Sequence, residues 1–205
     1  TLESINRSNI GFDRAAEITK WARKKGYSVD TELIFGMPKE TRTSFIKAID
    51  DLIGIGIDNV AMYNLKLLPG SKLHEKSERK RYDFNTMYRH VDDCYGEYEF
   101  ETKERIFEHE EVVVSTNTIS KEDYFFCRTV GMLVESLYSN GLLRPVFKFL
   151  ISRNILPSII FTDLATKGNI GKNLKKFLEE YTILVTNELF ESPDKIEKAI
   201  NNKKF

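Results

Sequence analysis

The chain has 205 residues, of which 41% are hydrophobic and 30% are charged, as in ordinary globular proteins. A chain of this length can bury roughly 70% of its unfolded surface, so it needs neither a disulfide nor a metal to hold a core. Lysine plus arginine and aspartate plus glutamate number 31 each, and this zero net charge argues against a strongly basic nucleic-acid-binding surface.

The first third of the chain alternates helical and strand patterns. In chain order they predict a helix over Phe12–Lys25, a strand over Val29–Phe35, a helix capped by Thr41 that runs to about Ile53, and a strand over Asn59–Leu67. Gly26 is suited to end the first helix because glycine adopts the left-handed conformation at low cost. Helices and strands that alternate at this spacing predict parallel strands joined by crossovers.

The composition changes after about Leu73. The charged run Lys76–Arg81 indicates a solvated linker, Tyr82–Glu111 shows little periodicity, and Val112–Val114 is compatible with a strand. Further helices are predicted over Ser120–Tyr138, Arg144–Ser152, Ser158–Lys167, Asn173–Phe190 and Pro193–Asn202. We therefore expect an α/β part over residues 1–75 and a mainly α-helical extension over residues 76–205.

Parallel α/β folds carry their sites at the carboxyl ends of the strands. Here those ends are Gly36–Glu40, Lys66–Ser71 and, if Thr1–Glu3 is the end of a strand, Glu3–Ser4. Gly36 leaves room for a ligand beside the backbone, and free N–H groups at the start of the next helix can bind polar atoms. Taken one at a time, the Gly36–Pro38 and Pro69–Gly70 segments are better explained as ordinary turns without a ligand.

Taken together, three segments are more specific. Leu2–Ser4 is followed by Thr31–Thr41, which reads TELIFGMPKET, and by Val60–Glu75, which reads VAMYNLKLLPGSKLHE. In this order and spacing they resemble the second half of a radical S-adenosylmethionine (SAM) barrel, of the group that carries a cobalamin-binding domain ahead of the barrel. In that family GxPxET follows the fifth strand, and PGT or PGS follows the sixth. The resemblance covers about residues 1–75.

The resemblance implies a fold, which is the C-terminal half of a (β/α) TIM-like barrel with parallel strands, and a set of cofactor contacts. Glu3 and Ser4 would lie near the ribose or the amino-acid end of SAM. Ile34, Phe35, Gly36 and Met37 would flank the adenine, and the backbone of Lys66, Leu67 and Leu68 would close over it. Glu40 and Thr41 would fix the turn and cap the helix.

The family cleaves SAM with an electron from a 4Fe–4S cluster held by a CxxxCxxC loop, and this implies the same cluster and SAM, with cobalamin, as cofactors. The chain departs from the pattern because Cys94 and Cys127 are its only cysteines and form no such motif. Since the chain also starts at Thr1, we expect a fragment that is inactive alone. Its expected partners are the missing N-terminal half, an unidentified substrate and a second copy of the fragment. Catalytic residues are not assigned.

Other interpretations remain open from the sequence. Residues 120–205 are compatible with a non-catalytic helical interaction module that carries a small α/β cap, and the Gly36 turn with a nucleotide-binding domain. His74, His90 and His109 are dispersed and form no metal-ligand pair, so no metal site is expected. The small number of cysteines and the absence of a membrane span or signal peptide lead us to expect a cytoplasmic protein without a membrane partner.

Overall fold

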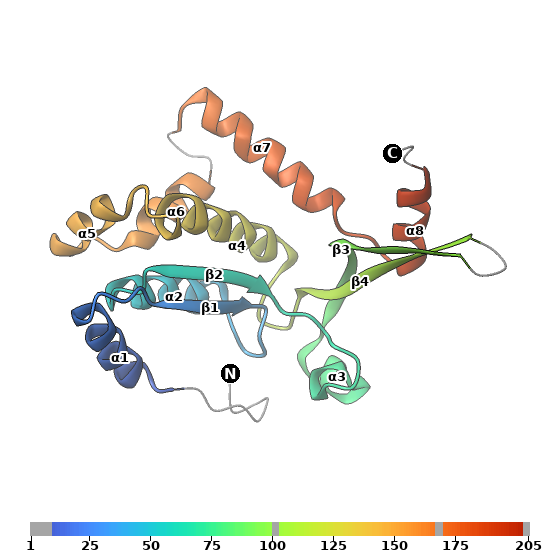
Figure 1. Ribbon diagram of the computed structural model, residues 1–205, viewed down its shortest axis with the longest axis horizontal. Coiled ribbons are helices and arrows are strands. Elements are labelled where there is room, and N and C mark those ends of the chain that lie inside the picture. Colours follow the sequence, from blue (N-terminus) through green and yellow to red (C-terminus); the bar gives the residue numbers. More distant parts are fainter. Residues whose placement is uncertain (1–9, 100–102, 167–169, 203–205) are drawn as a thin grey trace.

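The computed structural model describes residues 10–99, 103–166 and 170–202 (Figure 1). Its first elements are α1 (Phe12–Lys24), β1 (Asp30–Phe35), α2 (Arg42–Gly54), β2 (Asn59–Asn64), η2 (Lys72–His74) and α3 (Lys76–Tyr82). A hairpin of β3 (Asn85–Glu99) and β4 (Lys103–Ser115) follows. The remaining elements are α4 (Lys121–Val134), the π-helical turn η3 (Glu135–Ser139), α5 (Arg144–Ser152), α6 (Pro157–Ala165), α7 (Lys172–Asn187) and α8 (Pro193–Asn202).

The predicted strands of the first third pair in parallel, as expected. Their register runs from Asp30 opposite Asn59 to Phe35 opposite Asn64. Thr41 caps α2 through a reciprocal pair of hydrogen bonds, because its hydroxyl accepts from the Ser44 N–H at 3.1 Å and the Ser44 hydroxyl accepts from the Thr41 N–H at 2.9 Å. The described residues hold this two-stranded parallel sheet and no closed barrel, so the observed fold is mixed α/β.

Within the expected mainly α-helical extension, residues 85–99 and 103–115 are strands and not helices. They form a long antiparallel hairpin with a register shift between His90 and Tyr95. Cross-strand aromatic pairs help to hold it, with ring centroids 5.9 Å apart for Tyr88 and His109 and 6.0 Å apart for His90 and Phe107. Only the Val112–Val114 strand at its end was predicted.

The expected solvated linker at Lys76–Arg81 is also wrong, because this run forms α3. Glu78 and Tyr82 are buried on it. Both terminal nitrogens of Arg79 donate hydrogen bonds of 2.6 Å to the carboxylate of Glu111 on β4. The charges of this run therefore fix a helix against the hairpin, since a bidentate arginine–carboxylate pair also sets the orientation of its two partners.

The chain that leaves β2 ties the two sheets together. The Leu65 N–H donates to the Phe35 carbonyl at 2.8 Å and so continues the parallel ladder. On its other side, the Leu65 carbonyl accepts from the Val113 N–H, and the Leu67 N–H donates to the Glu111 carbonyl, both at 2.9 Å. The carboxyl ends of β1 and β2 therefore abut the hairpin directly.

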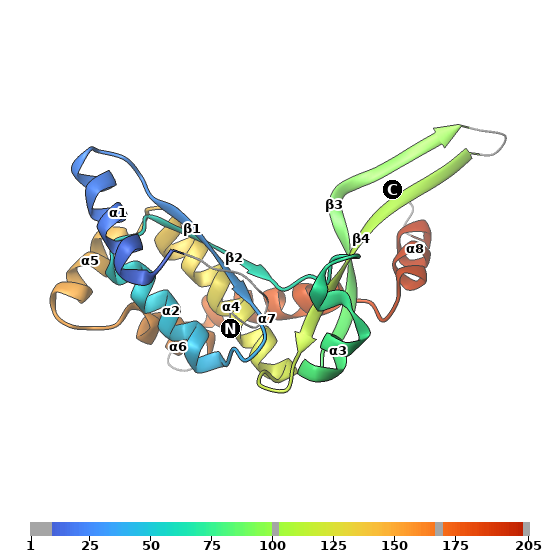
Figure 2. The same cartoon turned by 90° about the horizontal axis from the view of Figure 1, so that it is seen from below.

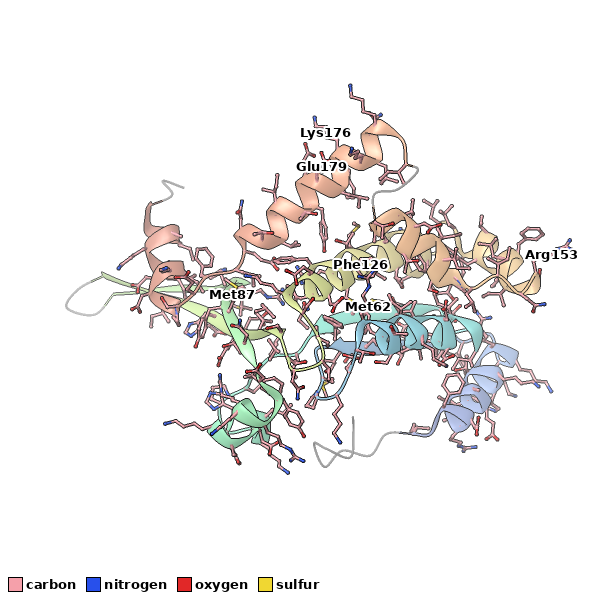
Figure 3. All side chains as sticks on the ribbon, turned by 180° about the vertical axis from the view of Figure 1, so that it is seen from behind. Met62, Met87, Phe126, Arg153, Lys176 and Glu179 are labelled. Carbon is pink, nitrogen blue, oxygen red and sulfur yellow. The ribbon has the colours of Figure 1, made fainter. Side chains whose placement is uncertain are left out.

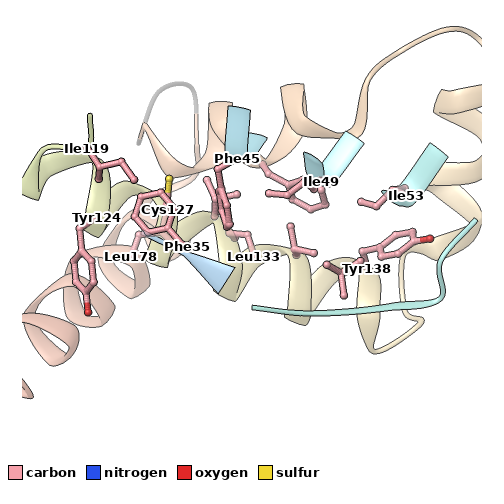
Figure 4. Packing of buried hydrophobic residues seen from close by; sticks show 14 of the residues in the cluster. Phe35, Phe45, Ile49, Ile53, Ile119, Tyr124, Cys127, Leu133, Tyr138 and Leu178 are labelled. Atoms are coloured by element: carbon pink, nitrogen blue, oxygen red, sulfur yellow. The ribbon is translucent and has the colours of Figure 1, made fainter. Parts of the chain in front are cut away.

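One hydrophobic core spans the predicted boundary near residue 75 (Figure 4). Phe35 of β1 and Phe45 of α2 pack edge to face, with ring centroids 4.8 Å apart. In the same cluster, Ile49 and Ile53 of α2 face Leu133 and Tyr138 from α4 and η3. α4 thus returns from the hairpin to pack beside β2.

The outer elements lie at opposite ends of the molecule. Figures 1 and 2 show the hairpin and α8 at one end and α1 and α5 at the other. In Figure 3, Met87 marks the hairpin end, whereas Arg153 lies at the α5 end and Lys176 near the far end of α7. In the part of the chain that the structure describes, no helix combines the length and apolar character needed to cross a bilayer.

Candidate functional site

The turn after β1 is built around one carboxylate. Gly36 has a φ of +94°, a conformation that favours glycine. The Glu40 carboxylate accepts hydrogen bonds from the Gly36 N–H at 2.8 Å and from the Met37 N–H at 3.3 Å. The Glu40 carbonyl in turn accepts from the Thr118 hydroxyl at 2.5 Å. Because Glu40 occupies these two amides, they are not free to hold a phosphate, and this disfavours the nucleotide-binding interpretation.

Glu40 is a partly buried acid whose carboxylate accepts backbone hydrogen bonds. Burial raises the pKa of Glu40 to about 7, although the hydrogen bonds from Gly36 and Met37 act in the opposite direction. The expected roles of Glu40 in fixing the turn and of Thr41 in capping the helix agree with these contacts.

Two of the predicted adenine neighbours have their side chains in hydrophobic clusters. Phe35 is 3% exposed and packs in the core under α2. Met37 is 7% exposed and packs with Leu65, Leu67 and Val113, and Ile34 lies against this second cluster. Phe35 and Met37 therefore offer a ligand little beyond their backbone. Glu3 and Ser4 lie outside the described residues.

The structure brings the two predicted motif segments side by side. A Cβ placed on Gly36 would lie 3.4 Å from the Cβ of Leu65, next to Lys66 in the chain. Of the three residues predicted to close over the adenine, Leu67 is buried and Leu68 is 61% exposed. Lys66 forms an ion pair with Glu110 of β4.

Lys66 is one end of a charged network that the sequence reasoning missed. Glu110 bonds Lys66 and Arg89, and Arg89 Nη1 lies 3.3 Å from Glu188 Oε1. The same Glu188 oxygen accepts from Arg128 Nη2 at 2.7 Å, and Arg128 Nη1 donates to Asn64 Oδ1 at 3.0 Å. Buried between these cations, Glu110 has its pKa below the usual range: burial alone would raise it, but the bonds from Lys66 and Arg89 outweigh that effect.

We call this network the Lys66–Asn64 relay. All of its members except Asn64 line one wall of a cavity of about 550 Å³. The other wall is mostly apolar and comes from the hairpin, α8 and the segment before α8, with Val91, Phe190, Ile196, Ala199 and Ile200. His90 and Asn187 complete the lining. Paired backbone hydrogen bonds of 2.7 and 2.8 Å between Tyr88 and Phe190 hold that segment on β3. Arg128 interrupts an apolar stretch of α4, and this was the one signal in the sequence that could have indicated the relay.

The described residues contain no ligand set for a metal or a cluster. Nowhere among them do three or more His, Cys, Asp or Glu side chains gather in a way that could hold a metal ion. Cys127 is buried in the core, and burial raises the pKa of its thiol. A buried, protonated thiol does not fit the role of an iron–sulfur ligand, which must be a thiolate.

Comparison with known proteins gives two similarities and no matching family model. The chain is 29% identical over 146 residues to the cobalamin-dependent radical SAM methyltransferase TokK of Streptomyces tokunonensis. The matched region covers 69% of this chain and 21% of TokK. It is 25% identical over 154 residues to the 2-(S-pantetheinyl)-carbapenam-3-carboxylate methyltransferase of Streptantibioticus cattleyicolor, covering 75% and 22%. The chain thus spans about a fifth of the length of these relatives.

Proposed function

We propose that the chain is the C-terminal part of a cobalamin-dependent radical SAM methyltransferase. The observation that carries this proposal is the meeting of Gly36 and Leu65, from the GxPxET and PGS segments, at the carboxyl ends of two parallel strands. The similarity to two proteins that are named methyltransferases supports an enzyme over a helical interaction module.

In this proposal residues 1–75 form part of the barrel, and residues 76–205 form the extension. Side chains alternate between the two faces of a strand. Because Phe35 faces the helices, Ile34 and its register partner Tyr63 belong to the opposite face, where Tyr63 is 47% exposed. In a closed barrel this face would line the interior, beside which SAM would lie.

The chain's own residues would bind and orient SAM. Glu40 holds the Gly36 turn in one conformation, and Ile34 would offer an apolar surface to the adenine. A bound 4Fe–4S cluster would supply the electron for reductive cleavage of SAM. Its ligands, and a cobalamin domain, would come from parts of the polypeptide outside this chain, since the cysteines here do not fit.

The test uses the full polypeptide that the gene encodes. We expect a CxxxCxxC motif upstream of Thr1, SAM binding after anaerobic cluster reconstitution, and release of 5′-deoxyadenosine under reduction. Ile34→Ala should weaken SAM binding roughly fivefold, because it removes apolar contact. Ile18→Ala on α1 is the matched control and should leave SAM binding unchanged. Absence of the upstream motif, or equal SAM affinity of the Ile34→Ala protein, would contradict the proposal.

A further inference from the structure

We propose that the cavity beside the Lys66–Asn64 relay binds a small organic carboxylate with an apolar body. The inference that this ligand is the substrate of the enzyme rests on the proposed function. The inference that the cavity binds an anion rests on the cavity alone. The volume of about 550 Å³ lies within the range of about 300–1,000 Å³ that is usual for small-molecule sites.

The charges of the cavity wall favour an anion. Among the described side chains that line it, Lys66, Arg89 and Arg128 are cations, Glu110 and Glu188 are carboxylates, and His90 adds an imidazole. With histidine counted as neutral, as in the formal charge of the chain, one positive charge is in excess. A single surplus charge matches a carboxylate better than a phosphate dianion, since a second negative charge would have no counterpart.

The ion pairs hold these cations in place before a ligand arrives. Arg89 is bonded to both Glu110 and Glu188, and Arg128 is bonded to both Glu188 and Asn64. Lys66 is the most accessible of the three, with 37% of its side chain exposed. A lysine ammonium has three N–H donors, so its ion pair with Glu110 leaves donors for a ligand. We therefore assign the direct contact with the carboxylate to Lys66.

The apolar wall of the cavity is the reason to expect a ligand with an apolar body. Ile196, Ala199 and Ile200 come from α8, and Phe190 stands before it. Ile196 is 2% exposed, so α8 is packed in place against the hairpin. A ligand that puts a carboxylate on Lys66 would thus lay its hydrocarbon part on α8, where its burial is favourable.

The probe for this site is hexanoate, titrated into the 205-residue chain and followed by calorimetry and by amide chemical shifts. Three compounds serve as comparison ligands. Acetate lacks the apolar body, hexanamide lacks the negative charge, and hexyl phosphate carries a phosphate in place of the carboxylate. We expect hexanoate to shift the amides of Lys66, Glu110 and Ile196, and to bind at least about fivefold more tightly than each of the other three. Equal binding of hexanamide would overturn the inference, and tighter binding of hexyl phosphate would overturn the choice of a carboxylate.

Two substitutions with opposite expected effects make the test independent of folding defects. Lys66→Met removes the surplus charge and should weaken hexanoate binding about tenfold. Glu188→Gln keeps the acceptor oxygen but raises the surplus to two charges, and should tighten binding severalfold. Lys176→Met and Glu179→Gln on α7 are the matched controls and should change nothing. Tighter binding by Glu188→Gln cannot come from a folding defect. Weaker or unchanged binding by a Glu188→Gln chain that keeps the thermal transition of the unchanged chain would overturn the inference.

Hexanoate binding by this chain requires neither SAM nor a cluster. A chain that fails to bind hexanoate while the full polypeptide still cleaves SAM would overturn this inference and leave the proposed function intact. If the chain binds hexanoate but the full polypeptide does not cleave SAM, the anion site stands and its interpretation as a substrate site is overturned.

Discussion

The Glu40 carboxylate lies 2.8 Å from the backbone nitrogen of Gly36, on the inner side of the turn that joins β1 to α2. Glutamate at this position therefore organises the backbone around the glycine. Replacing Glu40 with alanine would leave the N–H groups of Gly36 and Met37 without their acceptor. We expect Glu40→Ala to lower the free energy of unfolding by about 2 kcal/mol, measured by urea denaturation at pH 6.

The matched control for this loss is Glu17→Ala on α1. Glu17 pairs with Arg14, but both side chains are exposed, at 67% and 68%. An exposed ion pair of this kind contributes less than about 0.5 kcal/mol. If the two alanine variants lose equal stability, Glu40 does not hold the turn.

Protonation of Glu40 should make the stability depend on pH near neutrality. Its pKa is about 7 in the folded protein and 4.5 as the ordinary value, so the folded state binds more protons between these values. The contribution of Glu40 to the free energy of unfolding is complete below about pH 4.5 and is lost as the pH rises through 7. The size of the loss is about 3 kcal/mol.

A comparison with Glu40→Gln isolates this effect, because glutamine keeps an acceptor oxygen and does not titrate. We expect the free energy of unfolding of the unchanged chain, minus that of Glu40→Gln, to fall between pH 5 and pH 7 and to level off toward pH 8. A difference that stays constant over this range would show that Glu40 is ionised throughout.

The parts of the fold that the sequence predicted are those set by local patterns. β1, α2 and β2 follow from alternating or helical apolar spacing and from the Thr41 cap, whose partner is only three residues away. Each of these signals lies within a single element, so it does not depend on contacts with distant parts of the chain.

The hairpin and the relay depend on partners that are distant in the sequence. Tyr88 gains its role from His109, Arg79 from Glu111, and Arg128 from Asn64. The aromatic and charged residues of 82–111 carry no period of their own. Those whose contacts the structure describes, such as Tyr88, Arg89 and His90, are stabilised across the hairpin or against another helix. Only the tertiary structure identifies such pairs.

Asp58 provides a test of the contacts that hold α1 to the sheet. Its carboxylate accepts from Arg23 at 2.5 Å and from the Val29 N–H at 3.1 Å, and Arg144 lies 3.5 Å away. Burial alone would raise the pKa of Asp58, but these partners hold it below its ordinary value. We expect Asp58→Asn to cost roughly 2–3 kcal/mol of stability in urea denaturation at pH 7.

Asp51→Asn is the control for Asp58→Asn. Asp51 pairs with Lys47 one turn away on α2, with 39% of its side chain exposed, and its loss should cost less than about 0.5 kcal/mol. Because Asp58 has a lowered pKa, its stabilisation should also disappear as the pH falls below about 4, and the acid transition of Asp58→Asn should be correspondingly shallower. Equal costs at pH 7 for the two variants would contradict a special role for Asp58.

The chain produced by itself should associate. In the described residues β1 pairs along one edge only, with β2. Ile18, Trp21 and Tyr27, in and just after α1, are 38%, 58% and 62% exposed. An unpaired edge and neighbouring apolar side chains favour contact with another chain. Light scattering after size exclusion should therefore give about twice the mass of 23.8 kDa.

Substitutions on α1 distinguish this surface from other contacts. The double change Ile18→Ser and Trp21→Ser should shift the chain toward the monomer, because Thr19 and Ala22 carry the buried side of α1 and remain unchanged. Lys20→Ser, on the same helix, should leave the mass as in the unchanged chain. A monodisperse monomer with a single cooperative thermal transition would contradict the expectation, and would show that β1 and α1 need no further partner.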